Sequence, residues 1–170
     1  AASDVYKRQV EVLLCGLNVN ANETCAMAKN AGKIEMPTDI KVLEHPDVWI
    51  GDTGASAHFT PYEQGVTEVR KAGDDDAVTM GNKTAESIRK LGNINGILCD
   101  KYGNQLNKAK MTDVSIVPGC GYNMFSITRM ITKEGWNLIG NKSELTLEKN
   151  GNKIRFDIKI PTKRGYIFAT

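Results

Sequence analysis

The hydrophobic pattern of the chain changes near residue 47. Residues 1–46 mix Asn, Ala, Lys and Glu with one short apolar run, Val12–Leu14, and keep no sustained period. From Val48 onward, short runs of apolar and β-branched residues are separated by glycine-containing turns, which is typical of a small all-β fold. We therefore expect a poorly ordered lead-in over residues 1–46 and one folded domain over residues 47–170.

The clearest predicted unit is a hairpin near the C-terminus. Leu145 and Leu147 alternate with polar residues, and the alternation resumes over residues 154–160 after Asn150-Gly151. An Asn-Gly pair tolerates the positive φ angles of a type I′ turn. The pattern therefore predicts two antiparallel strands joined at residues 150 and 151.

One helix is predicted over residues 123–133. Met124, Ile127 and Ile131 fall on one face at helical spacing, and Gly135 can supply the left-handed C-terminal residue. Further strands are expected over residues 114–117, which end at a proline, and over residues 78–80 and 94–98. We expect the last two strands to pair across a turn at residues 81 and 82.

Composition narrows the function classes. The 22 Lys and Arg nearly balance the 20 Asp and Glu, giving a net charge of +2, so no strongly basic face for nucleic acid is expected. No segment approaches the roughly 18 consecutive apolar residues of a membrane helix. The 4 cysteines and 2 histidines have no zinc-ligand spacing. We expect a cytoplasmic protein without a metal, a cofactor or a membrane contact.

The stretch that carries chemistry follows the apolar strand that begins at Val48. The strand leads into Asp52, Thr53 and Gly54. Aspartic peptidases need a carboxylate at a tight turn, where a hydroxyl group can hydrogen-bond to the backbone and a glycine permits close approach of a second loop. The tripeptide alone is a weak signal, because it arises by chance in a few per cent of chains of this length.

The surrounding residues strengthen the signal. The stretch resembles the retropepsin domain of copia-type LTR retrotransposon Pol polyproteins, whose motif reads W-[IL]-[LI]-D-[ST]-G-A-[ST]-x-H-[MF]-T. The matching residues are Trp49, Ile50, Asp52, Thr53, Gly54, Ala55, Ser56, His58, Phe59 and Thr60. Two later segments are also similar to the family: the strand and V-P-G turn over residues 113–119 and the N-x-x-S-[VI] segment over residues 123–130. Gly51 departs from the motif, and we expect its missing side chain to loosen the strand that positions Asp52.

The resemblance implies a retropepsin-like antiparallel β-barrel with one short helix that forms dimers. The chain contains one Asp-Thr-Gly, whereas peptide hydrolysis by this class needs two carboxylates. Each subunit of a symmetric homodimer would therefore contribute Asp52. In the family, Thr53 cross-links the two loops and Gly54 lets them meet. The implied substrate is a Gag-Pol polyprotein, cleaved in the cytoplasm or within virus-like particles.

The substrate site is expected on both sides of this motif. The resemblance places a flap within residues 78–98, with Met80, Gly81 and Asn82 near its tip, although glycines in a plain surface hairpin fit the same pattern. Ala55, Ile116 and Val117 would line the site. These residues complete the predicted substrate-binding set.

Other readings remain open. His58 has no serine or cysteine nucleophile at a recognisable spacing, so a structural hydrogen bond that fixes the loop is favoured over catalysis. Trp49 and Trp136 are expected to fill the core or an interface. The alternative function is a catalytically inactive barrel that acts as an interaction or assembly module. A strictly monomeric protein would favour that alternative.

Overall fold

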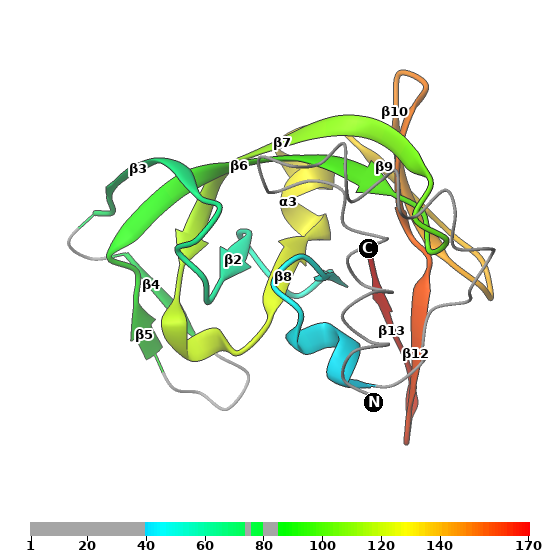
Figure 1. Ribbon diagram of the computed structural model, residues 1–170, viewed down its shortest axis with the longest axis horizontal. Helices are drawn as coiled ribbons and strands as arrows, with labels where there is room; N and C mark the ends of the chain where they lie inside the picture. The colour runs from blue at the N-terminus through cyan, green and yellow to red at the C-terminus, as the bar shows by residue number, and fades with distance from the viewer. Residues whose placement is uncertain (1–39, 74–75, 80–84) are drawn as a thin grey trace.

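The computed structural model describes residues 40–73, 76–79 and 85–170 of the chain (Figure 1). Strands dominate this part, and α3 is its one α-helix, so the predicted all-β class is confirmed. The helical elements are η1 (Ile40–Glu44), η2 (Pro118–Cys120) and α3 (Ile127–Thr132). The strands are β1 (Trp49–Asp52), β2 (Phe59–Thr60), β3 (Thr67–Lys71), β4 (Ala77–Thr79), β5 (Ala85–Ser87), β6 (Lys90–Cys99), β7 (Gln105–Ile116), β8 (Asn123–Ser126), β9 (Asn137–Gly140), β10 (Leu145–Lys149), β11 (Asn152–Phe156), β12 (Ile158–Thr162) and β13 (Gly165–Ala169).

One large sheet organises the fold. Its eight strands follow the order β12-β13-β1-β8-β2-β7-β6-β3. The sheet is mixed, because β1 pairs with β8 and β2 pairs with β7 in parallel, whereas an antiparallel barrel was expected. Parallel neighbours need a long connection, and 70 residues lie between the end of β1 and the start of β8. Among the described strands β12 and β3 remain edges, so the barrel does not close.

One long hairpin belongs to this sheet, and another forms part of a separate sheet. β6 and β7 form a long arched hairpin that runs over α3 (Figure 1). β10 pairs with β11 on one side and with β9 on the other, in a sheet of three strands. The turn between β10 and β11 has φ of 51° at Asn150 and 78° at Gly151, as a type I′ turn requires. The predicted Asn-Gly hairpin is confirmed.

The predicted helix over residues 123–133 is too long. Residues 123–126 form β8, because they pair in parallel with β1 from Trp49 to Asp52. Ser126 then caps α3, its hydroxyl accepting a hydrogen bond from the Arg129 amide. Met130 is buried on α3, whereas Ile131 is 39% exposed. The buried helical face therefore differs from the predicted one by one residue.

The predicted pairing of residues 78–80 with residues 94–98 is wrong. Val78 pairs with Glu86 in the two-stranded β4–β5 hairpin, while β6 pairs with β7 and β3. The alternating run over residues 154–160 is also divided, since β11 ends at Phe156 and β12 begins at Ile158. Asp157 stands between them and accepts a hydrogen bond from the Lys101 amide, which anchors the break.

The core consists of one main cluster and smaller ones. The main cluster packs β1, β8 and α3 against β6, β7, β10 and β11 and includes Trp49, Phe125 and Phe156. A second cluster joins β12 and β13 to η1, whose Val42 and Leu43 are buried. Residues 40–46, assigned to the lead-in from sequence, thus contribute side chains to the core. No described helix is long and apolar enough to cross a membrane.

Candidate functional site

The candidate catalytic carboxylate lies at the end of β1. Asp52 pairs in register with Ser126 of β8, and the chain leaves the sheet directly after it. Its Oδ1 accepts a hydrogen bond from the Gly54 amide at 2.6 Å. Asp52 is half-buried, whereas Thr53 and Gly54 are exposed. The loop therefore presents its backbone and the acid at the surface of a single chain.

Two hydroxyl groups from the β8–α3 junction hold this loop in place by hydrogen bonds. The Ser126 hydroxyl donates to the Ala55 carbonyl at 2.6 Å, and the Thr128 hydroxyl donates to the Thr53 carbonyl. The carbonyls on both sides of Gly54 are thus fixed to one helix start. Because Asp52 is anchored through Gly54, the same two hydroxyls set the direction of the carboxylate.

His58 has the expected structural role. The side chain is 2% exposed, and its Nδ1 accepts a hydrogen bond from the Ser126 amide at 3.0 Å. Its ring centroid lies 4.6 Å from that of Phe125. Burial, together with the positive charge of Arg129, lowers the pKa of His58 to about 4. The imidazole is therefore neutral near pH 7 and helps to fix the strand opposite Asp52.

Gly51 does not loosen the strand as expected. A Cβ atom at this position would lie 2.8 Å from Cδ1 of Phe156 and 3.1 Å from Cδ1 of Ile127. The buried ring of Phe156 fills the space that a side chain at residue 51 would need. The strand that positions Asp52 is packed because of this glycine, since an aromatic ring compensates for the missing side chain.

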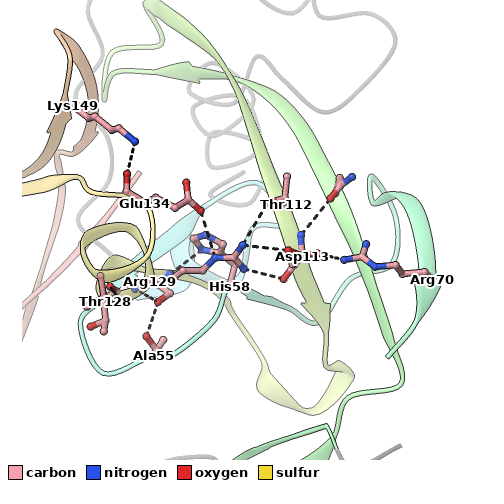
Figure 2. A network of polar contacts seen from close by, with 12 residues as sticks. Ala55, His58, Arg70, Thr112, Asp113, Thr128, Arg129, Glu134 and Lys149 are labelled. Atoms are coloured by element: carbon pink, nitrogen blue, oxygen red, sulfur yellow. Dashed lines mark hydrogen bonds and ion pairs between the residues drawn. The ribbon is translucent and has the colours of Figure 1, made fainter. Parts of the chain in front are cut away.

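Arg129 fastens α3 to the long hairpin. Its guanidinium lies between helix and hairpin, with Nη2 3.5 Å from Asp113 Oδ2 and Nε 3.6 Å from Glu134 Oε1 (Figure 2). Asp113 also pairs with Arg70 of β3. Arg129 is mostly buried, whereas its partners Asp113 and Glu134 are exposed, so solvent partly screens this network. It holds the helix start that carries Ser126 and Thr128.

Two of the predicted substrate-binding residues lie in contact with the β4–β5 hairpin region. Ala55 and Val117 meet in one apolar cluster with Phe59, and Val78 and Ile88 beside the β4–β5 hairpin pack against it. The hairpin therefore lies next to the Asp52 loop, where a flap is expected.

All described members of the predicted set are buried, and Ala55 is 8% exposed. Ile116 is 5% exposed and Val117 is 1% exposed, so both side chains are largely enclosed in the single chain. Met80, Gly81 and Asn82 lie outside the described residues. Their predicted contact with substrate stays a prediction.

Sequence reasoning missed the supporting residues Ser126, Thr128 and Arg129 as parts of the site. A serine directly before an apolar helical run is a capping signal, but it does not reveal which loop the hydroxyl contacts. Over the described ranges, no group of three His, Cys, Asp or Glu side chains could hold a metal ion. The site chemistry available here is that of a carboxylate, hydroxyl groups and backbone amides.

Comparison with known families supports a domain of a Pol polyprotein. The model of the Pol polyprotein β-barrel domain matches residues 49–136, which is just over half of the 170 residues. The matched stretch contains the Asp52 loop, both parallel strand pairs and α3. No curated protein and no solved structure matches the chain. The chain belongs to the family of Pol polyprotein β-barrel domains.

Proposed function

We propose that this domain is the aspartic endopeptidase of a copia-type retrotransposon Pol polyprotein. The observation that carries the proposal is the position of Asp52 at the end of β1, in a loop held by Ser126 and Thr128 and open to the surface. The substrate is an extended segment of the polyprotein, and the reaction is hydrolysis of a peptide bond in the cytoplasm or in virus-like particles. No cofactor is involved.

The active form is a symmetric homodimer. The chain has one Asp-Thr-Gly, so the second carboxylate comes from Asp52 of another copy. Exposure of Thr53 and Gly54 supports this arrangement, because a second loop can approach them. Two adjacent carboxyl groups repel each other when both are ionised, so the pair shares one proton.

Because the two carboxyl groups share one proton, one is ionised and the other is protonated, and each has its own catalytic role. The ionised group acts as general base on the water that attacks the peptide carbonyl. The protonated group donates to the carbonyl oxygen as negative charge develops there. The Gly54 amide, 2.6 Å from Oδ1, restricts the rotation of the Asp52 carboxylate in each chain.

Substrate binds between the Asp52 loop and the β4–β5 hairpin. Packing of Val78 and Ile88 against Ala55 and Val117 supports this placement. An extended peptide there adds as a strand through backbone hydrogen bonds, and its alternate side chains enter pockets on either side. Closure of the hairpin then excludes bulk water from the dyad.

A carboxylate-to-amide pair of variants tests the proposal. Wild type, Asp52→Asn and the control Asp100→Asn, in the β6–β7 turn, are each incubated with a mixed-sequence peptide library at pH 4–7. We expect cleavage by wild type and the control and none by Asp52→Asn. Sedimentation across concentration should show a dimer that a statine-type transition-state mimic stabilises by mass action.

The opposite results identify the alternative function. Unimpaired cleavage by Asp52→Asn contradicts the role of the acid. A wild-type protein that stays monomeric with the mimic and cleaves nothing is an inactive barrel, and its role is then interaction or assembly.

A further inference from the structure

One carboxyl group joins the end of the β6–β7 hairpin to the break between β11 and β12. The Lys101 amide donates a hydrogen bond to Asp157 Oδ2 at 3.0 Å. Asp157 is half-buried, and its neighbours Phe156 and Ile158 are buried in two different core clusters. Because both neighbours are packed, Asp157 holds the hairpin from a fixed position.

The hairpin end has its own internal hydrogen bonds. Oδ1 of Asp100 accepts from the amides of Tyr102 and Asn104, each at 2.9 Å. The Gly103 amide donates to the Asp100 carbonyl at 2.8 Å. These bonds lie within the turn, so the turn can leave Asp157 without losing its shape.

The same two elements enclose a cavity of about 440 Å³. Its walls include residues 96–99 and 107–112 of the hairpin and residues 152–154 of β11. Trp49 and Trp136 also line it. The bond from Lys101 to Asp157 ties the hairpin wall to the end of β11. Movement of the hairpin end therefore changes how open the cavity is to solvent.

The surroundings of Asp157 disfavour a negative charge. Burial raises the pKa of Asp157 above its ordinary value of 3.8, and the carboxylates of Asp100 and Glu144 raise it further. The hydrogen bond from the Lys101 amide acts in the opposite direction but is outweighed by burial. Asp100 lies on the hairpin turn and Glu144 lies directly before β10, so two packed elements each place an acid near Asp157.

The lysines of these elements have contacts of their own. The Lys101 ammonium lies 5.0 Å from the ring centroid of Tyr102. The Lys159 ammonium donates to the Lys142 carbonyl and lies over the ring of Tyr166. None of these lysines lowers the pKa of Asp157 through its charge.

We propose that the bond between Asp157 and the Lys101 amide is a pH-sensitive latch, which holds the hairpin end over the cavity in acid and releases it as the pH rises. A protonated carboxyl group keeps an oxygen that can accept from Lys101, so the bond survives protonation. The proposal goes beyond peptide hydrolysis and does not depend on it.

The direction follows from proton linkage. Release of the hairpin returns Asp157 to water, where its pKa is near 3.8. The closed state therefore binds the proton more tightly than the open state and is favoured as the pH falls toward that value. Between 3.8 and the raised pKa, the equilibrium constant for opening rises by up to about tenfold per pH unit, and it is constant above that window.

Hydrogen exchange of the Lys101 amide in the full chain tests the latch. Exchange rates between pH 4 and pH 8 are divided by the intrinsic rate at each pH, which gives the opening constant. We expect it to rise with pH in wild type. The Val117 amide, bonded to the Thr60 carbonyl at 2.8 Å, reports opening of the whole fold and should not follow the same curve.

Three variants locate the effect. Asp157→Asn keeps an acceptor but does not titrate, so Lys101 should open to the same extent at every pH. Glu144→Gln removes one negative charge, so the rise should level off at a lower pH. Asp76→Asn is the matched control, because the exposed Asp76 also accepts from an amide, that of Gly73 at 2.8 Å, and it should behave as wild type.

A second readout follows the cavity. Acrylamide quenching of tryptophan fluorescence should increase over the same pH range in wild type and stay constant in Asp157→Asn. Three results would overturn the inference: an opening constant for Lys101 that does not rise with pH in wild type, a wild-type profile in Asp157→Asn, and parallel curves for Lys101 and Val117. Quenching that is independent of pH in wild type would separate the latch from the cavity and contradict its stated role.

Discussion

Gly51 and Phe156 form a complementary pair beside the candidate acid. The space for a side chain at residue 51 is taken by the ring of Phe156, 2.8 Å from the ideal Cβ position. Gly51→Leu, which restores the residue of the family motif, should therefore lower the free energy of unfolding by about 1–3 kcal/mol through overpacking. Urea denaturation measures this change.

The same pair supplies its own control. Phe156→Leu replaces the ring with a smaller side chain, so Gly51→Leu should lower the free energy of unfolding much less in that background. Additive costs in the double variant would show that the two side chains do not compete for one space.

His58 predicts a pH dependence of stability. Its pKa is about 4 in the folded protein and 6.5 in the unfolded chain, so the unfolded chain binds more protons between these values. The free energy of unfolding should fall as the pH falls from 7 toward 4, by about 2 kcal/mol at pH 5 from this residue alone. Above pH 7 the contribution is constant.

Chemical denaturation of variants checks this slope. Burial also lowers the pKa of His45 to about 4, so both histidines contribute in the same window. His58→Gln and His45→Gln should each flatten the decline between pH 7 and pH 5. An unchanged slope in His58→Gln would mean that the imidazole is not kept neutral in the folded state.

The β8–α3 junction acts as the support of the site at the scale of elements. Thr128 donates to the Thr53 carbonyl, and Ser126 to the Ala55 carbonyl. Thr128→Val keeps the shape of the side chain but removes the hydroxyl, so we expect kcat for peptide cleavage to fall at least about tenfold with little change in KM. Thr128→Ser restores the hydroxyl and should restore kcat. Equal activity in the Val and Ser variants would show that this bond does not position Asp52.

The β10–β11 hairpin depends on its turn. Gly151 has φ of 78°, where a Cβ atom is strained whatever the space around it. Gly151→Ala should lower the free energy of unfolding by about 1 kcal/mol. Asn152→Ala at the next, exposed residue is the control and should change it by less than about 0.5 kcal/mol. Thermal unfolding of both variants decides whether the turn or the strand carries the cost.

For the molecule as a whole, the sequence predicted the structural features that depend on residues close together in the chain. The all-β class and the Asn-Gly hairpin follow from local alternation and turn chemistry. The predicted helix began too early, because pairing with β1 draws residues 123–126 into a strand despite their helical spacing. The predicted pairing of residues 78–80 with residues 94–98 was wrong for a similar reason, since two apolar runs do not reveal which strands pair.

The candidate site was likewise predicted from sequence only in part. The motif at Asp52 was visible because its residues are adjacent in sequence. The contacts that hold it were not, because Ser126 meets His58 across 68 residues and Thr128 meets Thr53 across 75 residues. Composition and periodicity carry no information about such pairs. The compensation of Gly51 by Phe156 was hidden for the same reason.

Mixing wild type with Asp52→Asn tests the shared dyad most directly. The variant is added to a fixed amount of wild type, and peptide cleavage is followed as the ratio rises. If each chain supplies one carboxylate, mixed dimers are inactive, so activity should fall to about half at equal amounts and to about one-eleventh at a tenfold excess. Activity that stays constant at every ratio would contradict the account, because each chain would then act without the acid of another.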